Sequence, residues 1–274
     1  MNVSPDPPVV LTTGEAAALE YVRVSLDAQI VTVTLNRPQV RNALHPPACA
    51  ELARVLDFCE SAEAVRAVII TGAGEEAFSA GFDLKYAEQH PELYEDPLFG
   101  SELVRRTDRC KPLIAAVNGL ALGFGFELAL ACDLIVAAEH AKFGLPEVRV
   151  GLAAMAGGIV RLTREIGTKQ ALGMILSARM ASAQEGKMLG FVNEVCADSA
   201  LAGALRWAME IVKGAPLSVA ASREIAYRQS EMPTLATALD PRSYTGALQV
   251  LESEDAQEGR RAFLEKRLPA WRGR

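Results

Sequence analysis

Apolar and polar residues alternate in the first regular stretch of the chain, "YVRVSLDAQIVTVTL" at residues 21–35. Alternation on both sides of a short turn around 27–29 predicts a β-hairpin. The next segment, 36–44, has the character of a loop. Two prolines then precede leucine and valine positions at helical spacing, which predicts a helix over 46–60.

Longer apolar runs farther along the chain are typical of buried strands. They lie at 65–74, 112–119 and 133–139, and helical segments intervene between them. Because strands alternate with helices and β-β-α units recur, the pattern predicts an α/β fold.

The pattern changes near residue 197, since no later run resembles a buried strand. Four later segments have helical character and are separated by prolines or glycine: 199–213, 216–230, 240–253 and 255–267. The predicted organisation is a flexible tail at 1–20, an α/β core at 21–197 and a helical C-terminal region at 198–274. Helical regions with apolar faces often dock on a neighbouring subunit, so we expect this region to serve oligomerisation.

Composition and charge narrow the class of protein. With 274 residues, 50% of them apolar and 23% charged, the chain has the make-up of a globular enzyme. A net charge of −6 argues against a nucleic acid or an anionic membrane as the main partner. The apolar run at 113–126 has 14 residues, fewer than the roughly 20 that a membrane-spanning helix needs.

Cysteine usage and the N-terminal sequence predict a cytoplasmic protein. The five cysteines lie far apart and form no Cys-x-x-Cys pair. This suits reduced thiols better than disulfides or a zinc site. The first 20 residues lack the basic region that opens a signal peptide, so they are interpreted as a loose tail.

Glu127 is the unusual residue in "GLALGFGFELALACD". Between 112 and 138 only Glu127 and Asp133 carry charge, and no basic residue lies three or four positions from Glu127. A carboxylate in such surroundings is costly unless it is paired or functional. Glycines precede a helix predicted to start near Phe126, and free N–H groups there can bind an oxyanion. Glu127 is therefore a candidate general acid or base, with complementation of the helix dipole as the structural alternative.

Glu147 is a second candidate carboxylate, in "AKFGLPEVRVG". Pro146 suits the first position of a short helix, which would place Glu147 in its first turn. Its neighbours at three and four positions are apolar or glycine, and Arg149 would point elsewhere on a helix. By itself Glu147 fits the surface as well as catalysis. A pairing with Glu127 gives it functional weight.

Two weaker motifs overlap in "VIITGAGEEAFSAGFDLK". Residues 72–77 fit a dinucleotide-binding fingerprint, but no strand-like run follows where that fold needs its next strand. Ser79 resembles a hydrolase nucleophile that His90 or His140 could serve, but it lies well beyond the strand. A glycine turn leading into a helix near Asp83 can bind an anion or an oxyanion.

The segment "KPLIAAVNGLALGFGFELALACDLIVAAEHAKFGLPEVRVGL" resembles the signature region of the enoyl-CoA hydratase/isomerase (crotonase) superfamily. The motifs "NRPQVRNAL", "AFSAGFDLK" and "SEDAQEGRRAFLEKRLPAW" extend the resemblance over nearly the whole chain after about residue 20. It implies a spiral of β-β-α units and a helical region used in trimer formation, hence a homotrimer or a dimer of trimers. It also implies an acyl-CoA substrate in fatty-acid or related metabolism, with neither a cofactor nor a metal.

The resemblance assigns roles to individual residues. Hydratases of the family hold a water between two glutamates, which align with Glu127 and Glu147. Two backbone N–H groups stabilise the thioester enolate, and they fall at Phe82 and Phe124. The residues expected near the CoA portion are Arg41, Ala43, Leu44, Ala80, Asp83, Leu84, Lys85, Phe263 and Lys266.

Departures from the family pattern bear on acyl-chain specificity. The family most often has glycine at 124, a small residue at 82, and Pro-Gly where this chain has Ala154-Met155. Phenylalanine adopts a positive φ less readily than glycine. The presence of both glutamates favours a 2-enoyl-CoA hydratase over a Δ3-Δ2 enoyl-CoA isomerase, which commonly keeps only one. A catalytically weak acyl-CoA-binding protein is the alternative of a different class.

Overall fold

The computed structural model describes residues 19–94, 101–106 and 108–274. The tail expected at 1–20 therefore lies outside the described residues, except for its last two positions.

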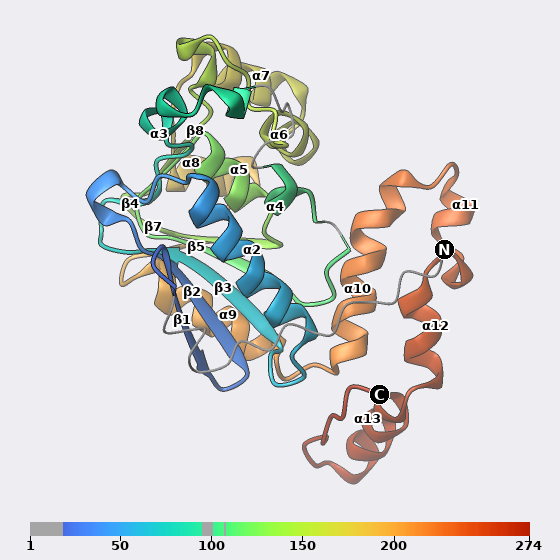
Figure 1. Ribbon diagram of the computed structural model, residues 1–274. Helices are drawn as coiled ribbons and strands as arrows, with labels where there is room; N and C mark the ends of the chain where they lie inside the picture. The colour runs from blue at the N-terminus through green and yellow to red at the C-terminus, as the bar shows by residue number, and fades with distance from the viewer. Residues whose placement is uncertain (1–18, 95–100, 107) are drawn as a thin grey trace, which may run out of the picture.

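In the part of the chain that the structure describes, six strands form the larger sheet, in the order β1-β2-β3-β5-β7-β10 (Figure 1). The first two strands form the predicted hairpin, with Val22 opposite Leu35, and the other neighbours run parallel. The three predicted buried strands are confirmed as β3, β5 and β7. The strands are β1 (Val22–Asp27), β2 (Ile30–Leu35), β3 (Ala67–Gly72), β5 (Leu113–Val117), β7 (Leu134–Ala138) and β10 (Glu194–Cys196).

A second sheet consists of very short strands in the order β4-β6-β8-β9. Each parallel strand β3, β5 and β7 of the larger sheet is followed along the chain by a short strand of this one. The chain thus repeats a β-β-α unit, which explains the predicted spiral. The strands are β4 (Ala77–Ser79), β6 (Leu120–Leu122), β8 (Lys142–Gly144) and β9 (Ala181–Ser182).

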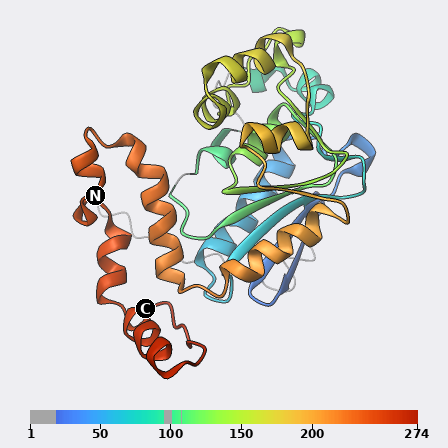
Figure 2. The same ribbon diagram turned by 180° about the vertical axis from the view of Figure 1, so that it is seen from behind.

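Helices cover both faces of the larger sheet at its central strands β3, β5 and β7, whose apolar residues are buried on both sides. Val68 and Ile70 of β3 face the core under α2, whereas Ile69 lies in the opposite cluster with Ala204 of α9. Figure 1 shows α2 in front of the sheet, and Figure 2 shows α9 on the other face. Small residues at four-residue spacing let α9 approach the strands closely: Ala200, Ala204 and Ala208.

The remaining helices of the core surround the short strands. The predicted helix over 46–60 is confirmed as α2. The helices up to residue 211 are α2 (Pro46–Ser61), α3 (Leu84–Gln89), α4 (Ser101–Arg105), α5 (Phe124–Leu130), α6 (Gly158–Ile166), α7 (Thr168–Ser177), α8 (Ala183–Leu189) and α9 (Ala200–Ile211). Single 3-10 turns are η1 (Pro38–Val40), η2 (Pro91–Tyr94) and η3 (Glu147–Val150).

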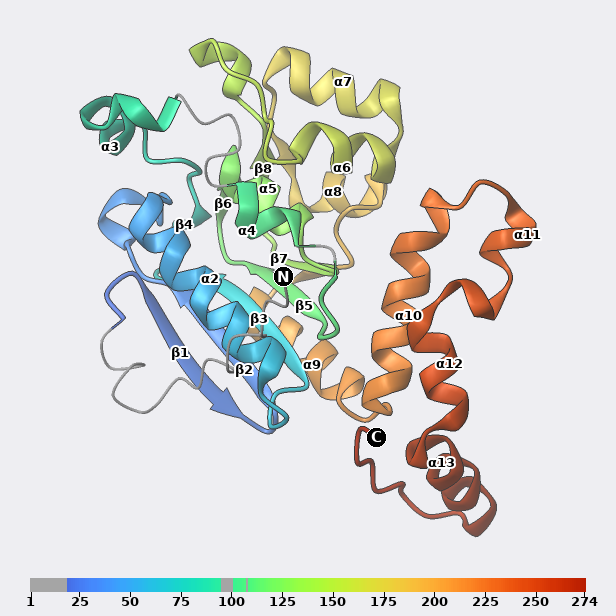
Figure 3. The ribbon, with the colours of Figure 1, turned by 45° about the vertical axis from the view of Figure 1, so that its right-hand side comes forward.

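The C-terminal part of the chain is helical, as predicted, and it extends away from the sheets (Figure 3). Its elements are α10 (Pro216–Arg228), η4 (Gln229–Glu231), α11 (Leu235–Ala238), η5 (Pro241–Ser243), α12 (Thr245–Glu252) and α13 (Glu254–Glu265). This extension exposes large apolar side chains at Leu235, Leu239, Leu251, Phe263, Leu264 and Leu268. Its predicted role in oligomerisation stays a prediction. None of the described helices combines the length and apolar character needed to cross a bilayer.

Candidate active site

The start of α5 positions the first candidate residue. Strand β6 ends at Leu122, and Gly123 turns the chain with a φ of 52° before the helix begins at Phe124, two residues earlier than predicted. The first N–H groups of a helix have no acceptor within it. Glu127 lies in this first turn, as predicted. Its N–H makes the first hydrogen bond of the helix, to the carbonyl of Gly123 at 3.0 Å.

Glu127 is a buried carboxylic acid, with 3% of its surface exposed. Its Oε1 accepts a hydrogen bond of 2.8 Å from the N–H of Gly158. Burial raises the pKa of Glu127 to about 7, while the hydrogen bond from Gly158 opposes the rise and the charge of Glu147 adds to it. A Cβ at position 158 would lie 2.8 Å from Glu127 Cγ, so this close approach requires glycine.

Glu147 reaches the same place from η3. Pro146 caps this 3-10 turn rather than occupying its first position, so the predicted short helix is a single turn that starts at Glu147 itself. Glu147 Oε1 lies 3.1 Å from where a Cβ of Gly123 would be, so the carboxylate lies against the start of α5. Its Oε2 is buried without a hydrogen-bond partner among the described residues, and burial raises the pKa of Glu147.

The loop that contains Phe82 lies beside the start of α5. Leu44 N–H donates to the Gly81 carbonyl at 2.7 Å, and Asp83 N–H donates to the Leu44 carbonyl at 2.9 Å. A Cβ on Gly81 would lie 3.2 Å from the backbone nitrogen of Phe124. Figure 3 shows β4 and β6, which lead into these two segments, next to each other. The backbones at Phe82 and Phe124 are therefore neighbours.

Positive φ angles fall on the glycines of these turns and not on the phenylalanines. Gly81 has a φ of 98° and Gly123 a φ of 52°, whereas Phe82 and Phe124 have ordinary negative values. The phenylalanines therefore cause none of the backbone strain that a left-handed conformation would impose on them.

Most residues predicted to contact CoA lie on two joined loops. Ala80 N–H donates to the Arg41 carbonyl at 2.9 Å. Asp83 caps the start of α3, so Leu84 and Lys85 form its first turn. Arg37, which the sequence reasoning missed, joins the two loops because its Nη1 donates to the Ala43 carbonyl at 2.6 Å and to Asp83 Oδ2 at 3.0 Å.

Phe263 and Lys266 lie at the far end of the helical extension. They belong to α13 and the residue that follows it, and Figure 3 shows this helix remote from α3 and α5 of the same chain. Phe263 is 83% exposed. Their predicted contact with CoA thus applies only to an assembly in which α13 reaches the loops of another chain, and it stays a prediction.

The hydrolase alternative has no geometric support. Ser79 is fully buried, and its Oγ accepts the N–H of Gly81 at 3.1 Å. The ring of His140 contacts the Glu75 carbonyl at 3.3 Å, and His90 contacts Glu92 at 3.0 Å. The serine and the histidines therefore have separate partners and do not form a triad.

Arg161 is a residue near the site that sequence reasoning missed. Its Nη1 donates to the Ala156 carbonyl at 3.5 Å, and its Nη2 donates to the Val104 carbonyl. The positive charge of Arg161 counteracts the rise in the pKa of Glu127. No sequence signal places Arg161 there, because it lies 34 positions from Glu127 (161 − 127) on another helix. The paired glycines before α6 could have indicated the close approach.

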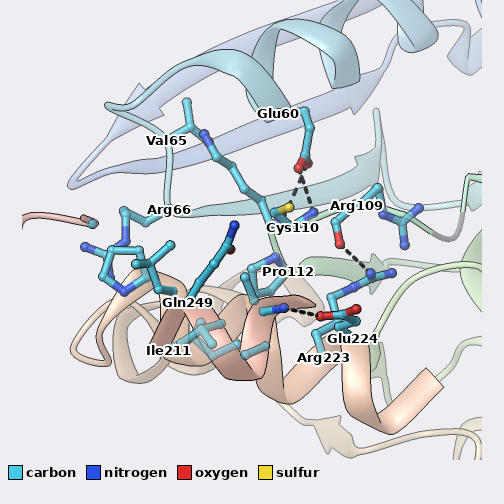
Figure 4. A pocket seen from close by; sticks show the side chains of 18 of the residues that line it. Glu60, Val65, Arg66, Arg109, Cys110, Pro112, Ile211, Arg223, Glu224 and Gln249 are labelled. Carbon is cyan, nitrogen blue, oxygen red and sulfur yellow. Dashed lines mark hydrogen bonds between the residues drawn. The ribbon is translucent and has the colours of Figure 1, made fainter. Parts of the chain in front are cut away.

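A large cavity lies elsewhere, between the core and the helical extension (Figure 4). It has a volume of about 970 Å³ and is lined by residues such as Arg66, Lys111, Arg223 and Glu224. Neither glutamate and neither phenylalanine of the candidate site lines it. The converging glutamates, and not this cavity, therefore define the candidate site.

Fold and site together define an α/β protein that brings a buried carboxylate, Glu127, and a half-buried one, Glu147, to the first turn of a helix, an arrangement suited to general acid–base chemistry. Residues 25–274 match the family model described as enoyl-CoA hydratase/isomerase. The chain belongs to this family, and it is thus an enzyme of the crotonase superfamily.

Individual relatives agree with this assignment. Carnitinyl-CoA dehydratase of Citrobacter koseri is 43% identical over 263 residues, which are 93% of this chain and 99% of that protein. The protein of the same name from Salmonella typhi is 41% identical with the same coverage. The crystal structure of an enoyl-CoA hydratase from Bacillus anthracis has a TM-score of 0.86 at 35% identity, and covers 93% of this chain and 100% of that one.

Proposed function

We propose that the protein catalyses the reversible addition of water to the double bond of a 2-enoyl-CoA thioester. The observation that carries the proposal is the convergence of buried Glu127 and half-buried Glu147 at the start of α5. Burial raises the pKa of both carboxyl groups, that of Glu127 to about 7, which suits proton transfer at physiological pH. Membership of the family supports a CoA thioester as the substrate.

The backbone at Phe82 and Phe124 supplies the oxyanion hole in this proposal. The thioester oxygen gains negative charge as water adds to Cβ, and two N–H groups donate hydrogen bonds to it. Each such donor contributes about 3–4 kcal/mol to transition-state stabilisation in enzymes of other families. The proximity of Gly81 to the Phe124 nitrogen supports a shared position for the two donors.

The two glutamates handle the protons of the water. The water oxygen forms a bond to Cβ while one carboxylate takes a water proton, and a carboxylic acid delivers a proton to Cα. The double bond becomes a single bond, and one water is consumed for each 3-hydroxyacyl thioester formed. Dehydration follows the same steps in reverse. The assignment of the two transfers to Glu127 or Glu147 stays open.

A turnover assay tests the proposal against its alternatives. With crotonyl-CoA, hydration removes the ultraviolet absorbance of the conjugated thioester, and we expect this loss. With a 3-enoyl-CoA, a Δ3-Δ2 isomerase would instead create that absorbance and stop at the conjugated product. Binding of acyl-CoA without either change would refute the proposal and favour the acyl-CoA-binding alternative.

A second candidate substrate is suggested by the relatives named carnitinyl-CoA dehydratase. A carnitinyl thioester has a hydroxyl on Cβ and a quaternary ammonium group on the next carbon, so its dehydration is the same chemistry in reverse. The greater identity to these relatives, 41–43%, than to the hydratase of solved structure, 35%, favours this candidate. Comparison of kcat/KM for carnitinyl-CoA and 3-hydroxybutyryl-CoA tests it, and equal values would remove its support.

A further inference from the structure

Arg161 joins three segments that surround Glu127. Its Nη2 donates to the carbonyl of Val104 in α4, and its Nη1 to the carbonyl of Ala156 at 3.5 Å. Its own backbone N–H donates to the Gly157 carbonyl at 2.8 Å. One side chain therefore connects α4, the loop before α6, and α6 itself.

Gly157 provides the room for this guanidinium. It has a φ of 107°, and a Cβ there would overlap Arg161 Nη1. The next residue, Gly158, donates its N–H to Glu127 Oε1 at 2.8 Å. The guanidinium thus rests on the residue directly before the one that holds the carboxylate, so a shift of Arg161 would move the hydrogen bond to Glu127.

The charge of Arg161 acts on Glu127 without a direct ion pair. No nitrogen–oxygen contact within 4.0 Å joins the two side chains in the described part of the chain. Arg161 is itself half-buried, and burial lowers its pKa. The other ionisable groups that act on this pair lie on η3, α6, α10 and the segment before β5, and they are Glu147, Glu165, Tyr227 and Arg109.

We propose that Arg161 is a positioning residue for the hydration reaction. It fastens residues 156–158 to α4, so that Gly158 presents its N–H to Glu127 in a fixed geometry, and its charge favours the ionised form of that carboxylate. This inference rests on the proposed function. Arginine is suited to this role because its planar guanidinium offers separate nitrogens to two carbonyls on different segments, whereas a lysine ammonium is a single point charge.

Two substitutions of Arg161 separate the effect of its positive charge from the effect of its planar guanidinium geometry. Arg161→Gln removes both, and we expect kcat to fall about 10–100-fold with KM changed less than about threefold, since small misplacements near reacting groups have effects of this size. The pKa that Glu127 shows in the pH profile of kcat should move upward, because a nearby cation is lost. Arg161→Lys keeps the positive charge, so we expect it to leave the pH profile of kcat unchanged and to recover part of the kcat that Arg161→Gln loses.

Arg164→Gln is the matched control, since Arg164 is exposed on the same helix. We expect it to leave kcat and its pH profile unchanged. A folded Arg161→Gln enzyme with wild-type kcat and an unchanged pH profile would overturn the inference. Should Arg161→Gln fail to fold, Arg161→Lys decides, because a folded lysine enzyme with wild-type kcat would show that the guanidinium geometry has no positioning role.

A measurement without turnover separates this inference from the proposed function. Infrared difference spectroscopy follows the carboxyl band of Glu127 as pH changes, and Glu127→Gln identifies that band. Failure of the wild type to hydrate any enoyl thioester would refute the proposed function. An unmoved Glu127 titration in Arg161→Gln would instead refute the role of Arg161.

Discussion

Replacement of Glu127 by glutamine should harm activity and help stability at the same time. The amide oxygen of glutamine can still accept the hydrogen bond that Gly158 donates at 2.8 Å, so the loop before α6 should keep its place. The variant loses only the ability to carry charge and to exchange a proton. We expect kcat to fall about 10²–10⁴-fold, equivalent to about 3–5 kcal/mol of transition-state stabilisation.

The effect on stability follows from the raised pKa. Glu127 titrates at about 7 in the folded protein, above its ordinary value of 4.5. The stability that the neutral acid contributes is therefore present in full below pH 4.5 and is lost as the pH rises towards 7 and beyond. A difference of this size corresponds to about 3 kcal/mol, and glutamine does not undergo this loss because it does not ionise.

Urea unfolding between pH 4 and pH 9, together with crotonyl-CoA turnover, measures both effects. The free energy of unfolding of Glu127→Gln minus that of the wild type should increase by up to about 3 kcal/mol between acid and alkaline pH. Glu139→Gln is the control, because Glu139 is an exposed carboxylate. Wild-type turnover in a folded Glu127→Gln protein would refute the catalytic role. A stability difference that is independent of pH would refute the electrostatic reasoning.

Other expected outcomes test the remaining parts of the site and the assembly. Glu147→Gln should also lower hydration about 10²–10⁴-fold, whereas an isomerase would be nearly unaffected in an isomerisation assay. Phe124→Pro should fold, because proline is tolerated at the first helical position, but it should lose turnover with its N–H, whereas Phe124→Gly should stay active. Residues 240–267 should bury apolar side chains between subunits, so a clean active monomer in ultracentrifugation would contradict a trimer. Asp133→Asn should lower the free energy of unfolding, measured with urea, by about 3 kcal/mol. The reason is that the substitution removes the negative charge that lies 2.8 Å from the buried guanidinium of Arg223. An unchanged value would show that the packing of α10 does not depend on this ion pair.

The long elements of the fold could be predicted from the sequence because each has a clear period. The hairpin, the buried strands and three of the four C-terminal helices are found where the pattern places them. The segment predicted as a helix over 240–253 is a 3-10 turn followed by α12 from Thr245, and α11 was not predicted. The short strands β4, β6, β8 and β9 were not predicted. They contain two or three residues each, which is too few for alternation to show, and they form because the preceding strands deliver them to the second sheet.

The candidate site could be predicted only in part. The isolation of Glu127 could be predicted, because the sequence shows that its neighbours are apolar and that no basic residue lies at helical spacing from it. Glu147 was recognised from the sequence, but two other groups that act on Glu127, Gly158 and Arg161, lie more than 30 positions away in the chain. Such contacts depend on how helices pack, and no local pattern contains that information. Similarly, the ion pair of Arg37 with Asp83 joins loops that only the fold brings together.

The two phenylalanines that depart from the family pattern illustrate how backbone and side chain have separate tasks. Phe124 is buried in the main hydrophobic core, and Phe82 packs against the same core. Their side chains therefore add apolar packing, while the proposed catalytic contribution comes from the backbone N–H groups, whose turns are made by Gly81 and Gly123. The departure at Met155 differs in kind, because that side chain is 69% exposed in the loop before α6. Met155 is the most exposed of the three residues, so we expect acyl-chain specificity to depend more on Met155 than on the phenylalanines.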